Sequence, residues 1–364
     1  MFFAMILFSC EIKEIDINEI SEDGESSIIP VKIAKWYNNH SAALSIDNDA
    51  GSAEGEAERT VQKLVLGNNL TMDYEFVTKL YKEDTIRWNY FENTFLPNGF
   101  GYFGHGDTHI NHDALTEDEA YISFKKCYDT MIELGLKPVS YAYPGGFGYH
   151  MRTHRALKKA GFIASRMFEK LNNENPYIIP DKETQPENWF MLPTLVMQAY
   201  DYTSCTICIN NTEQLIPHLN NTIEKNAWLI LTYHSIGQTG SYGFYHLEDF
   251  KNDLIEIAKR DFWVTHNDYV VLYIFERNAA TVNVELIKEK TNTDEKIKVR
   301  IDDDLDNERF NIPLTLLFDV PHNWLRRKLI LVQDSTIINQ YEFESNPIKI
   351  SILPNEKKYE LVLE

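Results

Sequence analysis

Between residues 42 and 265, short apolar runs of β-forming residues alternate with stretches that repeat their apolar residues at helical spacing. This alternation is typical of a parallel α/β architecture, because consecutive parallel strands need a crossover connection that is usually helical. We predict from it an α/β fold with an incomplete (β/α) barrel, whose chemistry would lie at the carboxyl ends of the strands. Seven runs predict the strands: residues 42–46, 70–77, 101–104, 139–143, 162–166, 228–233 and 262–265.

Helical patterns with identifiable ends lie between these runs. Thr116 and Glu119 form a capping box that opens a helix, and this helix should end before Gly135. A second helix is predicted over about residues 152–160, with Gly161 as its stop signal. One face of the first helix presents the apolar residues Ala120, Phe124, Cys127, Met131 and Leu134. A third helix, near residue 250, presents Leu247, Phe250, Leu254 and Ile257 on one face.

After Arg277 the pattern changes to short β-like runs separated by turn residues and charges. Such spacing predicts a small all-β, sandwich-like domain. We therefore expect a signal and tether over residues 1–30, a barrel domain over residues 31–278 and an all-β domain over residues 279–364. The β-like runs are residues 281–290, 296–301, 313–320, 329–332, 348–352 and 359–363.

The first ten residues end in Leu7-Phe8-Ser9-Cys10, which resembles a bacterial lipobox. Acylation of Cys10 would attach the chain to a membrane and place it in the bacterial cell envelope. A signal peptide requires a basic residue before its apolar run, and none is present here. We therefore expect the true start to lie upstream. The run is far shorter than the ~20 residues that span a bilayer, and no transmembrane helix is predicted.

Charge and cysteine usage limit the partners. The chain has 35 Lys and Arg against 55 Asp and Glu, a net charge of −20, which excludes nucleic acid as the expected partner because its phosphates must be neutralised. Four cysteines are too few for a disulfide scaffold. Cys127 is expected in the core, and no function is assigned to the Cys205-x-x-Cys208 pair, which lacks a second pair at zinc-finger spacing.

Three imidazoles follow one of the predicted strands. His105, His109 and His112 lie within eight residues, and the first two would converge on one metal ion if the segment turned helically. Two imidazoles and a carboxylate suit Zn or a similar divalent ion in a hydrolase, although non-haem iron takes the same residue types. Carboxylates are available at Asp47 and Asp49, in a segment that also suits a structural turn.

Two further segments follow strands. Residues 141–148 run from a strand into a Gly-rich turn, where backbone N–H groups can approach a ligand as an oxyanion donor requires, although a plain tight turn needs glycines too. His234 follows the apolar run 228–233, where a barrel strand would deliver a side chain to the site.

Taken in order, these segments resemble the polysaccharide deacetylases of carbohydrate esterase family 4. The resemblance spans about residues 31–277 and implies an incomplete (β/α)7 barrel. It rests on four segments: residues 42–51 for an Asp-Asp motif, His105-Gly-Asp-Thr-His109 for metal histidines, Ala142-Tyr-Pro-Gly-Gly146 for a Pro-containing turn, and Leu229-Ile-Leu-Thr-Tyr-His234 for a Leu-x-x-His motif.

The resemblance implies a role for each matching residue. His105 and His109 would be metal ligands, His234 the general acid, and the Gly145 N–H an oxyanion donor. In the family, one Asp of the first motif is the general base and the next Asp is the third ligand.

This chain has Asp47-Asn48-Asp49 at the first motif, which departs from the family pattern. We assign Asp47 as base and Asp49 as ligand, because side chains two apart on an extended chain point to the same face. The reverse assignment stays open, and His112 is the substitute ligand. Many members also carry Arg where this chain has Ala142.

The function implied is metal-dependent removal of N- or O-linked acetyl groups from a polysaccharide or oligosaccharide, with Zn, Co or Ni as the ion. One alternative is a catalytically impaired, carbohydrate-binding pseudoenzyme at the cell surface. Another is an adhesion module that acts through the all-β domain. Four aromatic residues near the loops would serve either as stacking surfaces for sugar rings or in ordinary packing: Tyr143, Phe147, Tyr149 and Trp189.

Overall fold

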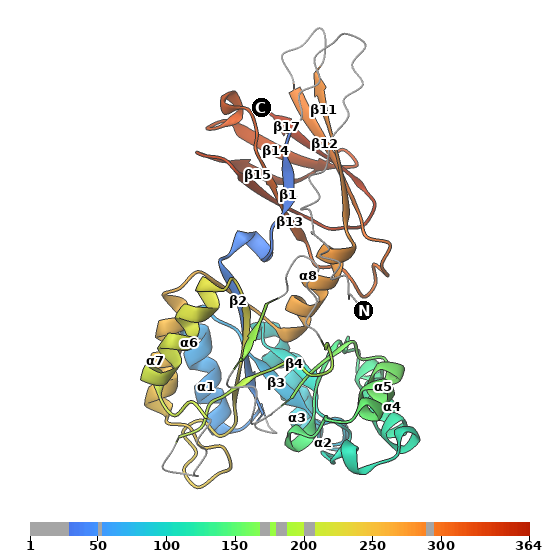
Figure 1. Ribbon diagram of the computed structural model, residues 1–364, viewed down its shortest axis with the longest axis vertical. Coiled ribbons are helices and arrows are strands. Elements are labelled where there is room, and N and C mark those ends of the chain that lie inside the picture. The colour runs from blue at the N-terminus through green and yellow to red at the C-terminus, as the bar shows by residue number, and fades with distance from the viewer. Residues whose placement is uncertain (1–28, 50–52, 168–174, 180–187, 200–207, 289–294) are drawn as a thin grey trace, which may run out of the picture. The chain divides into compact units, whose positions relative to one another are not determined.

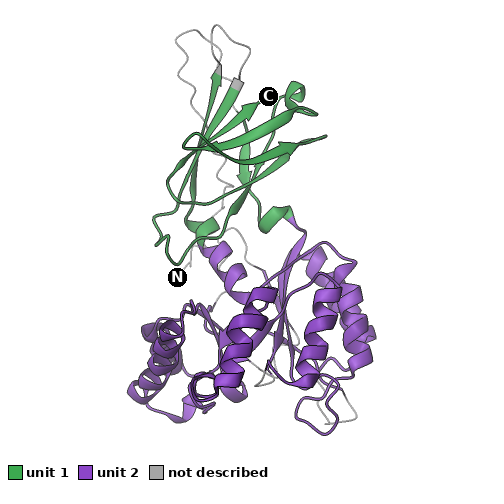
Figure 2. Cartoon of the chain, turned by 180° about the vertical axis from the view of Figure 1, so that it is seen from behind, with its two compact units in different colours: residues 1–39, 276–364 green, residues 40–275 purple. Residues whose placement is uncertain are grey.

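The computed structural model describes residues 29–49, 53–167, 175–179, 188–199, 208–288 and 295–364. The lipobox-like residues 7–10, the tether and Cys205 therefore lie outside the described residues. The chain divides into two compact units, residues 40–275 (unit 2) and residues 1–39 with 276–364 (unit 1) (Figure 2). Residues 31–39, which the sequence prediction gave to the barrel domain, belong to unit 1.

Unit 2 contains an open sheet in which all seven predicted strands are present and pair with one another in parallel (β2, β3 and β4 are labelled in Figure 1). The order is β6-β5-β4-β3-β2-β9, and β10 pairs with the start of β2. This arrangement confirms the predicted incomplete barrel. The strands are β2 Ala42–Asn48, β3 Asp73–Phe76, β4 Gly101–Gly104, β5 Ser140–Ala142, β6 Ala164–Arg166, β9 Trp228–Tyr233 and β10 Phe262–Val264, with two-residue additions β7 Tyr177–Ile178 and β8 Leu195–Val196 beside β9.

Helices connect these strands and bury one face against the sheet. Helix α4 has the predicted capping box, with Thr116 and Glu119 bonding each other's backbone N–H groups, and Gly135 follows it with a left-handed φ of 79°. The helices are α1 Glu56–Gly67, α2 Thr78–Glu83, α3 Thr85–Tyr90, α4 Glu117–Glu133, α5 Met151–Ala160, α6 Thr212–Glu224, α7 Leu247–Ala258 and α8 Asn267–Ala279, with a π-helical turn at Phe91–Phe95.

The buried face of α4 agrees with its apolar pattern. Ala120, Phe124, Cys127 and Met131 are all buried in the main core. Cys127 is a free thiol, as expected of a core cysteine, whereas Cys208 is disulfide-bonded. Among the described residues, no helix is both long and apolar enough to cross a membrane.

Unit 1 contains two antiparallel sheets, which confirms the predicted all-β class. One has the order β11-β12-β17-β14-β15 and the other β1-β13-β16. The N-terminal strand β1 pairs with β13, so Val31 lies opposite Phe318. The strands are β1 Val31–Ile33, β11 Thr281–Lys288, β12 Glu295–Asp302, β13 Leu314–Phe318, β14 Lys328–Gln333, β15 Thr336–Glu342, β16 Ile348–Ile352 and β17 Lys358–Leu363.

Candidate metal site and active centre

Polar side chains gather at the carboxyl ends of the parallel strands, as the fold predicts. Asp47 lies near the end of β2, Glu75 near the end of β3 and Arg166 at the end of β6. His105 and His234 directly follow β4 and β9. All five are at most 9% exposed, although polar groups of this kind are rarely buried without partners.

The segment from His105 to His109 brings its two imidazoles together without a helical turn, which corrects the expected geometry. Gly106 and His109 both have left-handed backbone conformations, with φ of 89° and 53°. The two imidazole centroids lie 4.8 Å apart. The two imidazoles are therefore brought together by a loop with two left-handed residues, and not by a helical turn.

Asp107 fastens this histidine loop to two helices. Its carboxylate accepts a hydrogen bond from the Thr78 hydroxyl at 2.8 Å and an ion pair from Lys126 at 2.5 Å. The Thr78 N–H also donates to the carbonyl of Gly106 at 3.0 Å. The middle of the loop is thus held at the start of α2 and against α4.

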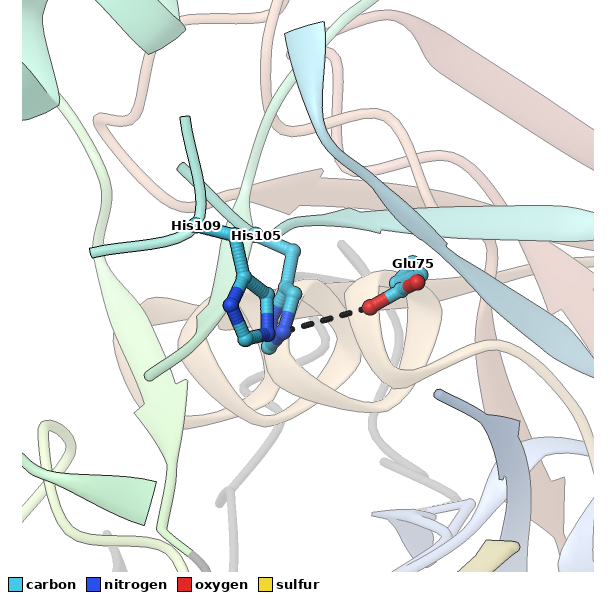
Figure 3. Close-up of side chains that lie close together, drawn as sticks. All are labelled: Glu75, His105 and His109. Carbon is cyan, nitrogen blue, oxygen red and sulfur yellow. Dashed lines mark ion pairs between the residues drawn. The ribbon is translucent and has the colours of Figure 1, made fainter. Parts of the chain in front are cut away.

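Two carboxylates approach the same nitrogen of His105. The Nε2 atom lies 3.2 Å from Asp49 Oδ1 and 3.2 Å from Glu75 Oε2 (Figure 3 shows Glu75). The other nitrogen, Nδ1, lies 2.9 Å from the carbonyl of Ala142, which can only accept, so Nδ1 must carry the proton. In the neutral ring, Nε2 then directs a lone pair at two carboxylates.

A cation between these groups would remove the repulsion. The donor atoms of Glu75, His105 and His109 all lie within 4.8 Å of one another (Figure 3). Two imidazoles and a carboxylate suit a divalent transition metal. The hydrogen bond from His105 to a backbone carbonyl is also the outer contact that orients metal-bound histidines. The residues therefore fit a divalent ion.

The charges of the cluster agree with this interpretation. Burial lowers the pKa of His105 to about 4, so the ring is neutral at neutral pH. Burial and the adjacent charge of Asp49 raise the pKa of Glu75 well above its usual value. Burial by itself would raise the pKa of Asp49, but the nearby side chains of His105 and Arg166 hold this pKa well below its usual value. Glu75 therefore binds a proton more readily than Asp49 does.

Arg166 ties the two aspartates of the first motif together. Its Nε donates to Asp47 at 2.6 Å and its Nη2 donates to Asp49 at 3.0 Å. The other Asp47 oxygen accepts from the Asn267 side chain at 2.6 Å. Burial raises the pKa of Asp47 to about 7, against the effect of Arg166. Asp47 is fully buried behind Asp49 and is held from both sides.

The register of β5 and β6 explains how this arginine reaches the aspartates. Ala142 on β5 is the direct neighbour of Arg166 on β6. Ala142 is also the position at which many members of the resembled family carry Arg. The guanidinium therefore reaches both aspartates from the strand next to Ala142.

His234 is buried near Asp49, whereas Gly145 is exposed. His234 Nε2 is 3.8 Å from Asp49 Oδ2, and burial lowers the pKa of its imidazole. Gly145 is exposed in the turn Pro144–Gly146 and has a left-handed φ of 66°. The roles of general acid and oxyanion donor stay predictions for these two residues.

Other predicted contributors lie elsewhere. His112 is fully buried, stacks on Phe124 at 4.0 Å between ring centroids and has its Nε2 3.0 Å from the Ser123 hydroxyl. These contacts place it in the packing of α4 rather than in the metal cluster. Tyr143 is buried in the core, and Trp189 is partly buried and packs on Phe275.

Comparisons with known proteins give structural matches only. No family model and no curated protein matches the sequence. A solved structure from Mycobacterium smegmatis, described as a polysaccharide deacetylase, is 15% identical, covering 66% of this chain and 93% of that one, with a TM-score of 0.46. These matches lie in the family that the motifs resemble. At such identities they concern the fold alone.

Two more matches have the same character. A family 4 carbohydrate esterase from Streptomyces lividans is 12% identical, covering 61% of this chain and 87% of its own, with a TM-score of 0.37. A pseudoenzyme of the same family from Bacillus anthracis is 10% identical, covering 63% of this chain and 65% of its own, with a TM-score of 0.39.

Sequence reasoning missed three members of the site: Glu75, Arg166 and Asn267. Glu75 and Arg166 each lie inside a run that was predicted as a strand, and a charged residue within a buried parallel strand was the available signal. Asn267 starts α8 and reaches Asp47 across the chain, for which the sequence offers no local signal.

Proposed function

We propose that unit 2 is a metal-dependent hydrolase that removes acetyl groups from a polysaccharide or oligosaccharide. The observation that carries this proposal is the orientation of His105, whose Nδ1 is used by the Ala142 carbonyl while Nε2 meets two carboxylates at 3.2 Å. Such an arrangement is stable with a cation in place. The order of the motifs, which resembles the polysaccharide deacetylases, supports acetyl transfer to water as the chemistry.

Glu75, His105 and His109 would hold the ion, for which Zn, Co and Ni are the candidates. A bound divalent ion supplies Lewis-acid chemistry that polarises the acetyl carbonyl. This assignment gives the third ligand to Glu75, whereas the sequence had given it to Asp49.

Asp49 would then act as the general base and take a proton from the attacking water. It is ionised and lies between His105 and His234. Asp47, assigned as base from the sequence, is enclosed by Arg166 and Asn267 and would serve to hold the guanidinium.

His234 would donate a proton to the leaving amine or alkoxide as the bond to the acetyl carbon breaks. The N–H of Gly145 would donate to the oxyanion that forms on the former carbonyl oxygen. The products are acetate and a sugar with a free amine or hydroxyl group.

The test is acetate release from N-acetylated chito-oligosaccharide and O-acetylated xylo-oligosaccharide, with and without added Zn²⁺, Co²⁺ or Ni²⁺. We expect release that needs the ion, stops on chelation and is lost in His105→Ala. His218→Ala is the control, because His218 contacts Tyr177 rather than the cluster. Binding of the oligosaccharides without acetate release under any ion would support the pseudoenzyme alternative, for which Asn48 at a family ligand position is the motivating feature.

Attachment to the cell envelope through Cys10 is a further proposal. The lipobox resemblance supports it, and so does the disulfide at Cys208, because disulfides persist mainly in oxidising compartments outside the cytosol. Expression of the full chain in a bacterial host followed by detergent phase partition tests it. Cys10→Ser should move the protein from the detergent phase to the aqueous phase, and an unchanged distribution would argue against lipidation.

A further inference from the structure

The loop between β9 and α7 folds back toward the strand end that presents His234. The Gly237 N–H donates to the Tyr245 carbonyl at 2.8 Å, and the Tyr245 N–H donates to the Ser235 carbonyl at 3.1 Å. Tyr245 is fully buried and packs edge-on against Tyr233, with ring centroids 5.3 Å apart. The base of the loop is therefore fixed to the barrel, and its tip is held close to the site.

Gly243 shows how closely the tip approaches. Its φ is 64°, a left-handed value that favours glycine, and a Cβ at this position would lie only 2.7 Å from the Cβ of His234. A side chain at residue 243 would thus displace the imidazole or the loop. The loop backbone rests directly against His234.

Tyr242 precedes this glycine and lies beside the same imidazole. The two rings are nearly perpendicular, at 89°, with centroids 5.1 Å apart. His234 is only 9% exposed, whereas Tyr242 is 64% exposed. A large aromatic ring is therefore held against a buried polar group of the site while most of its own surface faces solvent, which packing alone does not account for.

We propose that Tyr242 contacts the substrate and that the sugar bearing the acetyl group stacks on its exposed ring. This inference rests on the proposed function, because it takes His234 as the group beside the leaving atom. Aromatic faces carry partial negative charge and attract the weakly positive C–H groups on the face of a pyranose ring. The stacked sugar would direct its amine or hydroxyl toward His234.

Glycan binding by the metal-free full-length chain tests the contact independently of catalysis. Isothermal titration with N-acetylated chitopentaose and with O-acetylated xylo-oligosaccharide identifies the glycan that the wild type binds. For that glycan we expect Tyr242→Ala to weaken binding about five- to tenfold and Tyr242→Phe to retain it, since the ring provides the contact.

Tyr269→Ala is the matched control. Tyr269 is 47% exposed and stands edge-on to His266, with centroids 5.1 Å apart at 78°, so it repeats the geometry against a histidine outside the cluster. Its replacement should leave glycan binding unchanged. Equal binding by Tyr242→Ala and the wild type, an equal loss in Tyr242→Phe and Tyr242→Ala, or no binding of either glycan by the wild type would each overturn the stacking contact.

Hydrolysis by the same variants separates this inference from the proposed function. Weaker binding in Tyr242→Ala, combined with no acetate release from the wild type and added ion, would support the contact and overturn the hydrolase. With an active wild type, Tyr242→Ala should raise KM for the oligosaccharide by a larger factor than it lowers kcat on 4-nitrophenyl acetate, which has no sugar to stack on the ring. An equal loss of kcat on both substrates would instead assign Tyr242 to positioning His234 and overturn the substrate contact.

Discussion

Glu75 and Arg166 join the cluster from strands other than those that carry the sequence motifs. Glu75 reaches the histidines from β3, and Arg166 reaches the aspartates from β6. The histidines could be predicted from the sequence because they are adjacent in a motif. The other two could not, because their roles depend on which strands are neighbours in the sheet and in which register.

Exchanging charges for amides separates the ligand from the base. We expect Glu75→Gln to lower the affinity for Zn²⁺ by more than the ~10- to 100-fold that outer contacts contribute, because a negative ligand is lost. Asp49→Asn should keep the ion and lose acetate release. Equilibrium dialysis and the acetate assay measure the two effects.

Glu256→Gln is the control for these variants, since this carboxylate pairs with Lys259 and Arg260 instead. Loss of the ion in Asp49→Asn but not in Glu75→Gln would return the ligand role to Asp49.

Moving the arginine from position 166 on β6 to position 142 on β5 tests whether these two neighbouring positions reach the same aspartates. Arg166→Ala should destabilise the chain by ~3–5 kcal/mol, because two buried carboxylates lose their partner. The double variant Ala142→Arg with Arg166→Ala should recover at least half of that loss. Urea unfolding measures the free energies. Arg155→Ala, which removes an exposed ion pair with Glu117, should cost less than ~1 kcal/mol, and an equally small cost for Arg166→Ala would contradict the pairing.

At the scale of elements, the predicted strands of the barrel are confirmed. They could be predicted because their apolar runs are bounded by turn residues. The boundaries shift by a few residues, as at β3 and β6. The prediction failed where burial was incomplete: β15 is an edge strand with exposed residues and lacks the apolar alternation that marked its neighbours. The prediction also failed at the histidine loop. The four-residue spacing of its histidines suggested a helical turn and gave no indication of left-handed backbone conformations.

That loop offers a test of positioning by backbone conformation. Gly106→Ala should cost ~1–2 kcal/mol in stability, because φ is 89°, and should weaken Zn²⁺ binding, because relief of the strained backbone would move the loop that carries both histidines. The added Cβ would lie 3.5 Å from the His109 nitrogen and 3.3 Å from the Tyr141 hydroxyl. Thermal unfolding and titration with Zn²⁺ measure the two effects.

Gly135→Ala provides the comparison for this loop variant. It has a similar φ of 79°, with nothing within 4 Å of the added Cβ. A similar loss of stability with unchanged Zn²⁺ affinity is expected there. Unchanged affinity in Gly106→Ala as well would show that the loop tolerates displacement.

At the scale of the whole molecule, unit 1 contains a buried acid that makes its stability depend on pH. Both carboxylate oxygens of Glu276 lie 3.0 Å from the Ile312 N–H, and burial raises the pKa of Glu276 to about 8 from 4.5. The folded state therefore binds more protons than the unfolded state between these values. Stability should fall as pH rises through this window, by up to ~1.4 kcal/mol per pH unit.

Hydrogen exchange in β12 and β13 at pH 5 and pH 8, corrected for the intrinsic exchange rates, measures this dependence within unit 1. Glu276→Gln should flatten it, because the amide does not titrate. Glu285→Gln, at an exposed position on β11, should leave it as in the wild type. If the corrected protection of the wild type does not change between the two pH values, the proposed pH dependence of stability through Glu276 is wrong.

The pairing of β1 with β13 has a consequence for the order in which the chain is made. During synthesis on a ribosome, β1 emerges first and its partner strand only after all of unit 2, so unit 2 can fold while β1 waits for a neighbour. A gene fragment cut at residues 31–278 would leave β1 permanently without its partner strand, as an aggregation-prone edge. The fragment to express for the barrel alone is residues 40–275.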